Sequence, residues 1–246
     1  MMAMLLAAGR GERMRPLTDH TPKPLLEVGG KSLIVWHIEN LVRAGICEII
    51  INHAHLGAQI EKALGGGNRF GAHIQYSTET HALETAGGIA NALPLLLPSP
   101  AGGEKGEPFA VINSDIFCDY DFTYLPEHAA ALQANGDAAH LVLVDNPIHH
   151  PNGDFLLHTG RIEDHSNLWL TPNDLQLTFS GIGIYQPALF KGIPRGSIAP
   201  LAPLLRAQIA LGKVSGEHHQ GLWVDVGTPQ RLAELDRQVR SLHNAP

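Results

Sequence analysis

Small and cationic side chains are concentrated directly after the first apolar segment of the chain. Residues 1–8 form an almost unbroken apolar run, which is typical of a strand buried on both faces of a parallel sheet. The run is followed by two glycines, three arginines and a lysine, namely Gly9, Gly11, Arg10, Arg13, Arg15 and Lys23. Glycine lets the backbone turn sharply and approach a ligand closely. Together with fixed cations, such a loop predicts a binding site for a polyphosphate.

This loop differs from the two common phosphate loops. A Walker A loop ends in Gly-Lys-Ser/Thr, and no such sequence follows Gly11. A dinucleotide-binding loop needs a third glycine at the position of Met14. An ordinary strand followed by a basic surface loop would not require both glycines, the arginines and a Pro-Lys-Pro in this order.

Residues 6–18 (LAAGRGERMRPLT), followed by Pro22-Lys23-Pro24, resemble the signature of the sugar-1-phosphate nucleotidyltransferases. The resemblance implies two catalytic residues, Arg13 at the leaving phosphates and Lys23 at the α-phosphate and the incoming phosphate. It also implies a set of nucleotide-binding residues in this loop, which are Ala8, Gly9, Gly11, Glu12, Arg13 and Lys23.

Two aspartates follow predicted strands. Asp115 comes after the apolar run 109–112, at the end of a strand where open α/β sheets bind ligands. Asp225 lies in the segment 223–228 (WVDVGT). Each aspartate alone could cap a turn or helix. The same family resemblance implies that both hold Mg²⁺, for which one or two carboxylates with phosphate oxygens and water are sufficient. Ser114 replaces a glycine of the family pattern.

The segment 83–88 (LETAGG) resembles the family segment that reads the base, which implies nucleotide binding by Glu84, Thr85 and Gly88. The family has glycine at the position of Glu84. This carboxylate could accept a hydrogen bond from the N3–H of uracil or thymine, or it could cap the following helix. Both interpretations remain open on the sequence.

The sugar side of the family pattern is less regular, because a common Glu-Lys-Pro is absent. The segments 144–155 and 51–55 instead resemble a narrower branch, the N-acetylmuramate α-1-phosphate uridylyltransferases of cell-wall recycling. We predict sugar contacts from Asn113, Asp145, Gly153 and Asp154. Neutral donors in 145–170 would suit a carboxylated sugar, and they are Asn146, His149, His150, Asn152, His165 and Asn167.

The periodicity over residues 1–145 predicts alternating strands and helices, and therefore an α/β fold with a Rossmann-like, mostly parallel sheet. The strands are predicted at 1–8, 48–52, 73–76, 109–113 and 140–144, and the helices at 32–43, 59–64, 85–93 and 125–133. Ser32 and Thr85 are predicted helix caps. A loop rich in glycine and proline is predicted at 99–106.

The second half predicts a small β-rich insertion for the sugar. Short strands and loops are expected over 146–186, with a helix at 200–211, strands at 213–218 and 222–224, and a last helix that Thr228 caps. We expect a single nucleotidyltransferase domain over 1–246, with a nucleotide-binding half (1–145) and a sugar-binding and C-terminal half (146–246).

Composition limits the class of protein. The 246 residues are 44% hydrophobic and carry a formal charge of −7, which argues against a nucleic-acid binder. The two cysteines form no CxxC pair and favour a cytoplasmic protein. No apolar run is long enough to predict a membrane span. The 15 histidines include His149-His150, His218-His219 and the pair His53 and His55, but their spacing does not predict zinc binding.

The sequence therefore predicts an enzyme that uses Mg²⁺, a nucleoside triphosphate and a sugar 1-phosphate, with no membrane, nucleic-acid or protein partner expected. The narrower resemblance implies UTP and N-acetylmuramate 1-phosphate as substrates and UDP-N-acetylmuramate and pyrophosphate as products. The alternatives are mannose 1-phosphate with GTP, glucose 1-phosphate with dTTP, or a non-catalytic sugar-nucleotide sensor on the same fold. Intact Arg13, Lys23, Asp115 and Asp225 argue against the sensor.

Overall fold

The computed structural model describes residues 1–97, 106–163 and 175–243. Among these residues, one sheet of nine strands forms the centre, in the order β5-β4-β1-β6-β11-β8-β12-β10-β9. Its strands are β1 (Ala3–Leu6), β4 (Glu48–His53), β5 (His73–Thr78), β6 (Phe109–Asn113), β8 (Ala139–Val144), β9 (Phe155–His158), β10 (Arg161–Glu163), β11 (Leu175–Tyr185) and β12 (Val214–His219). The loop predicted at 99–106 lies largely outside the described residues.

Most strands of this sheet run in one direction. β5, β4, β1 and β6 are parallel neighbours, as are β8 and β12. β11 runs antiparallel between β6 and β8, and β10 runs antiparallel between β12 and β9. The predicted mostly parallel, Rossmann-like sheet is confirmed, and its chain order reverses between β1 and β6, where open α/β sheets bind ligands.

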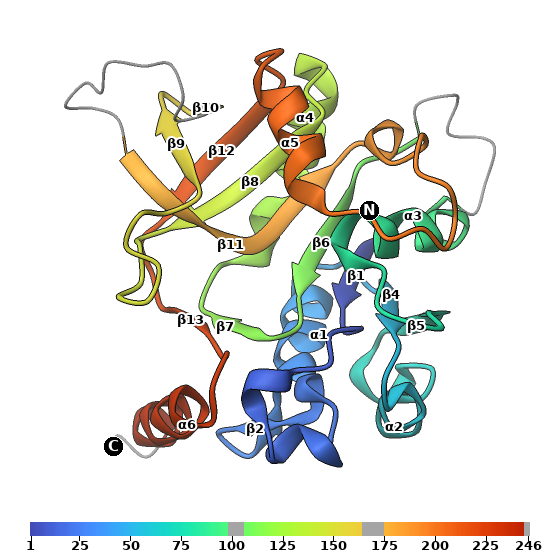
Figure 1. Cartoon of the computed structure of the whole chain (residues 1–246), viewed down its shortest axis with the longest axis vertical. Coiled ribbons are helices and arrows are strands. Elements are labelled where there is room, and N and C mark those ends of the chain that lie inside the picture. Colours follow the sequence, from blue (N-terminus) through green and yellow to red (C-terminus); the bar gives the residue numbers. More distant parts are fainter. Residues whose placement is uncertain (98–105, 164–174, 244–246) are drawn as a thin grey trace.

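Helices cover both faces of the sheet (Figure 1). They are α1 (Leu33–Arg43), α2 (Gly57–Leu64), α3 (Glu84–Leu96), α4 (Leu125–Asn135), α5 (Leu201–Ile209) and α6 (Pro229–His243). α1, α2 and α4 pack on one face through buried side chains such as Ile38, Ile60 and Leu132. α3 and α5 pack on the other through side chains such as Ile89 and Leu205. β1 is buried on both faces because helices cover each of them.

Two further sheets of two strands each lie beside the central sheet. β2 (Glu27–Val28) pairs with β3 (Lys31–Ser32), and β7 (Ile116–Cys118) pairs antiparallel with β13 (Trp223–Asp225). α6 packs beside β2 in a third apolar cluster around Leu235. The β7–β13 pair therefore joins the end of the first half of the chain to its C-terminal part.

The element boundaries differ modestly from those predicted. α3 begins at Glu84, and the residue before it is Leu83, so Thr85 is not its cap. Ser32 occupies the cap position of α1 but its side chain makes no capping hydrogen bond. Thr228 does cap α6, since its Oγ1 accepts from the Arg231 N–H at 3.3 Å. The end of the segment 146–186, where we expected short strands and loops, forms the single strand β11 of 11 residues, which lies in the centre of the sheet.

Candidate active site

The first loop lies at the carboxyl end of β1 and lines a cavity of about 480 Å³. Gly11 has a φ of +62° and lies beside Thr18 and Lys23, and its carbonyl accepts a hydrogen bond from Thr18 Oγ1 at 2.8 Å. Only glycine adopts this backbone conformation without strain. No protein atom lies within 4 Å of the position that a Cβ would take at Gly9, so the space beside its backbone is open to a ligand.

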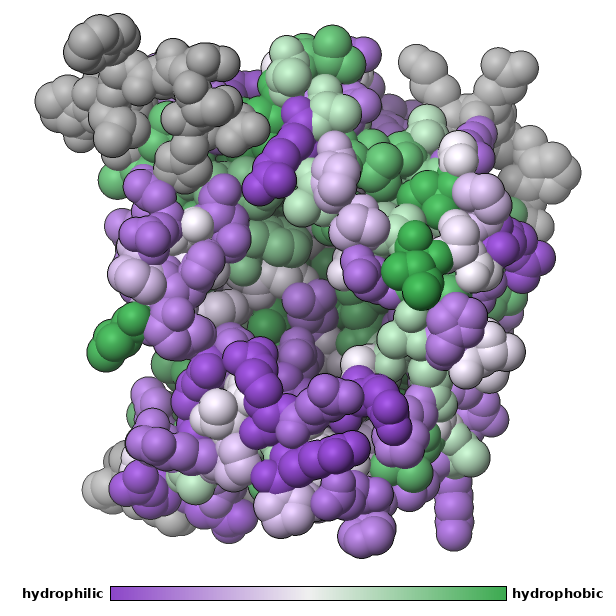
Figure 2. All heavy atoms as spheres, viewed as in Figure 1, coloured by the Kyte–Doolittle hydropathy of each residue, from purple (hydrophilic) through white to green (hydrophobic). Residues whose placement is uncertain are grey.

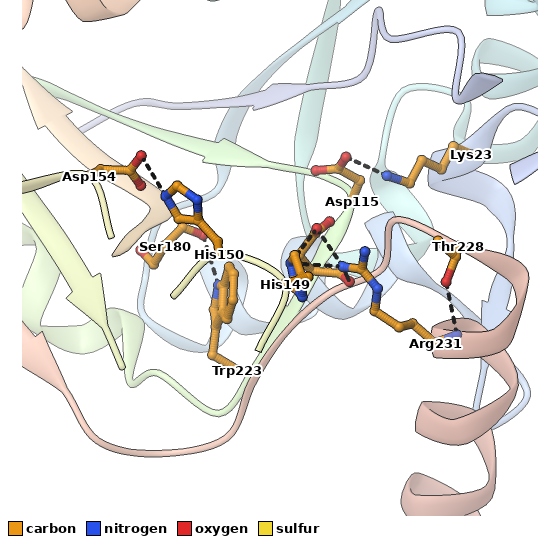
Figure 3. Close-up of polar contacts among 10 residues, drawn as sticks. Lys23, Asp115, His149, His150, Asp154, Ser180, Trp223, Thr228 and Arg231 are labelled. Carbon is orange, nitrogen blue, oxygen red and sulfur yellow. Dashed lines mark hydrogen bonds and ion pairs between the residues drawn. The ribbon is translucent and has the colours of Figure 1, made fainter. Parts of the chain in front are cut away.

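Lys23 is the buried cation of this cavity. Its side chain is 8% exposed, and Nζ lies 2.6 Å from Asp115 Oδ2 (Figure 3). Asp115 follows β6, and the preceding Ser114 donates through its N–H and its hydroxyl to the Leu6 carbonyl. Ser114 thus connects the end of β6 to the end of β1 by hydrogen bonds. These bonds explain how serine can replace the glycine of the family pattern. The predicted catalytic lysine and one predicted metal ligand therefore lie together.

Asp225 reaches the same region from β13. In the β7–β13 pair it lies opposite Ile116, and the Val226 N–H donates to the Asp115 carbonyl at 3.0 Å. Asp225 Oδ2 is 2.7 Å from Arg231 Nη1 and 3.5 Å from His149 Nε2. The cavity lining includes Asp115 and Gly227 but not Asp225, so Asp225 lies beside this lining, with its charge paired with Arg231.

Gly227 explains how Arg13 approaches the aspartates. A Cβ at Gly227 would lie 3.1 Å from Asp225 Oδ2 and 3.3 Å from Arg13 Nη2. The absence of a side chain at this position lets the Arg13 guanidinium and the Asp225 carboxylate occupy one edge of the cavity. Arg13, Glu12 and Ala8 all line it, so the structure brings the loop residues of the predicted site together.

The two carboxylates fit a magnesium ion by their chemistry. Asp225 is on β13 and Asp115 directly precedes its partner strand β7, beside a cavity that also holds Arg13 and Lys23. Mg²⁺ prefers such hard oxygen ligands and completes its shell with phosphate and water. Lys23 and Arg231 contact the Oδ2 atoms, and a bound ion would have to share these carboxylates with them.

A buried polar network that sequence reasoning did not place in the site joins the loop to the base-reading segment. Asn52 accepts from the Ala7 N–H at 2.9 Å and donates to Glu79 at 2.6 Å. Glu79 in turn accepts from the Leu83 N–H at 3.0 Å. Burial raises the pKa of Glu79, although these hydrogen bonds and nearby histidines oppose the shift. The signal was a polar residue, Asn52, at the end of the apolar run 49–51.

The segment 83–88, for which we predicted nucleotide binding, lies only partly in the cavity. Glu84 and Thr85 line it, and Glu84 has a φ of +58°, a left-handed conformation that glycine adopts more easily. This geometry accounts for the glycine that the family has at this position. Gly88 does not line the cavity. It lies against the network instead, since a Cβ there would be 2.8 Å from both Asn52 Nδ2 and Glu79 Oε1.

A second cavity of about 460 Å³ adjoins the first and shares Glu84, Thr85 and Asn113 with it. Figure 2 shows this face hollowed at its centre, with a strongly hydrophilic rim below. Asp154 lines the second cavity, and its Oδ2 accepts from the Phe179 N–H at 2.9 Å. The structure therefore brings two of the four predicted sugar residues, Asn113 and Asp154, to one continuous site.

The other predicted sugar residues lie apart from this lining. Asp145 is 79% exposed at its side chain and pairs with His218 at 2.9 Å. Gly153 packs against Asn146 and Leu177 with a φ of +59°. Sequence reasoning also missed Arg206 of α5, an exposed cation in the lining of the second cavity. A lone arginine on an amphipathic helix carries no local signal of a site.

Several of the neutral donors predicted to suit a carboxylated sugar contact other groups of the protein instead. Asn146 bonds Pro151, Gln176 and Thr178, and His150 contacts Asp154 at 3.1 Å. His149 contacts Asp225, and neither it nor Asn152 lines the second cavity. His165 and Asn167 lie outside the described residues. Arg206, unlike Asn146, His149, His150 and Asn152, lines the second cavity.

A glycine- and arginine-containing loop at the reversal point of an α/β sheet, with carboxylates opposite it, defines an enzyme that transfers nucleotidyl groups. The family model of nucleotidyl transferases matches residues 2–153. The chain is 54% identical over 235 residues to an N-acetylmuramate α-1-phosphate uridylyltransferase of Neisseria meningitidis serogroup B, covering 95% of this chain and 96% of that protein. The chain belongs to the nucleotidyl transferase family and is a sugar-1-phosphate nucleotidyltransferase.

Other relatives match this chain at lower identity. A mannose-1-phosphate guanyltransferase of Hypocrea jecorina is 32% identical over 94% of this chain, which spans 62% of that protein. A crystal structure from Bacillus anthracis, provisionally assigned as a glucose-1-phosphate thymidylyltransferase, superposes with a TM-score of 0.81 at 21% identity, covering 100% of this chain and 98% of the other. This structural likeness establishes the fold alone. In the described part of the chain, no helix has the length and apolar character needed to cross a membrane.

Proposed function

We propose that this enzyme converts UTP and N-acetylmuramate 1-phosphate to UDP-N-acetylmuramate and pyrophosphate. The observation that carries the proposal is the 54% identity to the Neisseria uridylyltransferase over nearly the full length of both chains. The reaction would place the enzyme in peptidoglycan recycling in the cytoplasm. Its free cysteines, Cys47 and Cys118, suit a reducing compartment.

The two adjoining cavities support a division of labour between the substrates. The triphosphate would lie along the first loop, with its base toward Glu84 and Thr85, and the sugar phosphate would enter from the second cavity. A phosphate oxygen of the sugar 1-phosphate is already anionic, so it needs no general base to attack the α-phosphorus. The P–O bond to pyrophosphate breaks as the new bond forms. The protein must therefore align two anions and neutralise their charge.

Lys23 and Arg13 are the cations we assign to that task. Lys23 is fixed by burial and by Asp115, so its ammonium is held in place before substrate binds. Arg13 is exposed at the opposite edge, where its guanidinium can bind two phosphate oxygens at once. We assign Lys23 to the α-phosphate and the incoming phosphate, and Arg13 to the leaving phosphates.

Asp115 and Asp225 would hold the divalent cation. When bound, Mg²⁺ supplies positive charge to the phosphate oxygens and a template for their alignment. The two strands of the β7–β13 pair fix the backbone positions of both carboxylates. Arg231 and His149 contact Asp225, which holds this side chain at the edge of the cavity in the absence of substrate.

The position of Arg206 supports the proposal that the sugar substrate carries a carboxylate. N-acetylmuramate carries a lactyl ether that ends in a carboxylate, and N-acetylglucosamine does not. The second cavity is lined by apolar side chains of α5 together with Arg206 and Asp154. An arginine beside an apolar wall can contact both the methyl group and the carboxylate of a lactyl ether.

The alternative substrate pair is mannose 1-phosphate and GTP. It is suggested by the 32% identity to the Hypocrea mannose-1-phosphate guanyltransferase. The deciding experiment measures pyrophosphate release with purified enzyme across four nucleoside triphosphates and the 1-phosphates of N-acetylmuramate, N-acetylglucosamine, mannose and glucose. We expect the highest kcat/KM for UTP with N-acetylmuramate 1-phosphate. Equal values for the two N-acetylated sugars, or a higher value for GTP with mannose 1-phosphate, would refute the substrate assignment and leave the enzyme class intact.

A further inference from the structure

Three potential metal ligands lie together between α4 and the sheet. The elements that carry them line neither of the two cavities. His128 is on α4, His140 is on β8 and Glu217 is on β12. One ligand atom from each of these three side chains lies within 4.8 Å of the others, and among the described residues they form the one such group. β8 and β12 are parallel neighbours in which His140 pairs with Ser215. His140 and Glu217 therefore project from adjacent strands toward α4.

The geometry points to a binding site for a divalent transition-metal ion such as Zn²⁺, coordinated by His128 Nε2, His140 Nε2 and a carboxylate oxygen of Glu217, and we propose that the protein binds one ion there. Two imidazoles and one carboxylate are a donor set that suits zinc. Mg²⁺ prefers oxygen ligands. The site therefore differs in metal class from the aspartate pair in the cleft.

Two imidazole nitrogens in this group are buried without a hydrogen-bond partner. These are Nε2 of His128 and Nε2 of His140, and the side chain of His140 is only 9% exposed. Both nitrogens lie near Glu217 Oε1, at 3.0 Å for His128 and 3.6 Å for His140. A cation shared by the three side chains would give each buried nitrogen a partner. The second nitrogen of His140, Nδ1, lies 3.0 Å from Ser215 Oγ. This contact orients the ring so that Nε2 points to the carboxylate, as outer-shell contacts do for metal-bound histidines.

The two separations between the carboxylate oxygen and the imidazole nitrogens are close to those around a tetrahedral ion. Glu217 Oε1 lies 3.0 Å from His128 Nε2 and 3.6 Å from His140 Nε2. Bonds of about 2.0–2.1 Å at tetrahedral angles place ligand atoms roughly 3.3 Å apart, between the two observed values. The histidine rings stack with centroids 4.3 Å apart, and the Tyr120 hydroxyl donates to Glu217 Oε1. Small side-chain movements would therefore suffice to admit the ion.

The ion would connect α4 to two strands of the central sheet. The spacing rules used on the sequence missed this site because its histidines lie on different elements.

The test uses Co²⁺ as a spectroscopic substitute for Zn²⁺ in the chelator-treated, full-length protein. We expect one equivalent of Co²⁺ to give the intense visible absorption of a tetrahedral ion, and Zn²⁺ to displace it and raise Tm. His128→Gln and His140→Gln should abolish this absorption and weaken Zn²⁺ binding by at least about tenfold. The matched control is His73→Gln, which removes an exposed histidine paired with Glu48 at 2.8 Å and should change neither readout.

Absence of the absorption at one equivalent in the wild-type protein would overturn the proposal. Its persistence in both variants would do so as well, because the ion would then be bound elsewhere. If His140→Gln does not fold, His128→Gln decides the question, since the His128 side chain is 23% exposed and its replacement leaves little buried space. Loss of the absorption in that variant, with its retention in His73→Gln, supports the site.

Discussion

Lys23 is held in a fixed position by contacts from two separate parts of the chain and by burial. The Gly11 backbone lies against its Cβ, Asp115 binds its ammonium at 2.6 Å, and its side chain is 8% exposed. A lysine side chain in solution loses about 2 kcal/mol of rotamer entropy when it is ordered. In this protein that ordering occurs during folding, so substrate binding does not have to provide it.

Replacing Asp115 or Asp225 with Asn should reduce kcat by about a hundredfold or more, because each change removes one charge from a site whose metal ion supplies several kcal/mol of charge stabilisation. The fold should persist, as both side chains are partly exposed. Arg231→Met is the matched control for Asp225→Asn, since it breaks the same 2.7 Å ion pair but keeps the carboxylate. Initial rates measured over a range of Mg²⁺ concentrations test this expectation. Near-normal turnover of an Asn variant at limiting Mg²⁺ would remove that residue from the metal assignment.

Arg206→Met should lower kcat/KM for N-acetylmuramate 1-phosphate by about tenfold, which is about 1.4 kcal/mol for the loss of one exposed charge-assisted contact. Methionine keeps most of the apolar stem, so the effect reports the charge. The rate with N-acetylglucosamine 1-phosphate should change little. Equal losses with both sugars would show that Arg206 supports the cavity wall and does not recognise the lactyl carboxylate.

At the scale of elements, the position of α3 depends on the close packing of its Gly88 against the polar network of Asn52 and Glu79. Gly88 lies where a side chain would overlap Asn52 and Glu79. The sequence resemblance predicted that Gly88 binds the nucleotide, and in the structure this glycine packs against Asn52 and Glu79. The reason for glycine there is packing of the helix against two buried polar groups, which depends on a contact between residues 36 positions apart and cannot be read from local spacing.

Gly88→Ala should lower the free energy of unfolding by about 1–3 kcal/mol, because the new methyl group overlaps Asn52 Nδ2 and Glu79 Oε1. Those side chains hold the first loop, so KM for UTP should rise as well. Gly66→Ala is the control, since no atom lies within 4 Å of a Cβ at that glycine. Urea denaturation and steady-state kinetics measure both effects. Unchanged stability of Gly88→Ala would mean that α3 can shift away from the network.

His37 gives the α1–β7 contact a dependence on pH. Burial lowers the pKa of His37 to about 4, although its contact with the Ile116 carbonyl and the charge of Asp115 oppose the shift. The unfolded chain takes up a proton near pH 6.5 and the folded chain only near pH 4, so stability falls as the pH decreases through this range.

We expect this histidine to account for about 3 kcal/mol of stability lost between pH 6.5 and 4, from 1.36 kcal/mol per pKa unit. His37→Asn should remove that part of the loss while lowering stability at pH 7. Urea midpoints at pH 7, 5.5 and 4.5 measure it, with His73→Asn at an exposed position as the control. A parallel pH profile for wild type and His37→Asn would contradict the assigned titration.

At the scale of the whole molecule, the two halves of the chain form one sheet. β11, from the second half, lies between β6 and β8 of the first, and β12 continues the sheet beyond β8. Local periodicity predicted the parallel strands of the first half because each is a separate apolar run between turn residues. It did not predict that the last strand of the 146–186 segment enters the centre of the sheet, since partners of a strand are chosen by long-range pairing.

The predicted single domain leads to a test by truncation. A fragment of residues 1–145 should not fold, because removing β11 leaves β6 and β8 without their shared partner and exposes the buried faces of both. A fragment with well-dispersed amide resonances would show instead that the nucleotide-binding half is autonomous. Co-expression of 1–145 with 146–246 is the control, since restored turnover would show that the two pieces lack only each other.

The pairing of β7 with β13 also bears on the order in which the proposed site is assembled during synthesis. Asp115 and Asp225 are brought together by strands from the middle and the C-terminal part of the chain, so a nascent polypeptide carries the complete first loop long before it has both carboxylates. Such an unfinished chain could attract a nucleotide but would lack the full set of groups that we assign to its activation. On that assignment, catalysis begins only after the segment that carries β13 has left the ribosome.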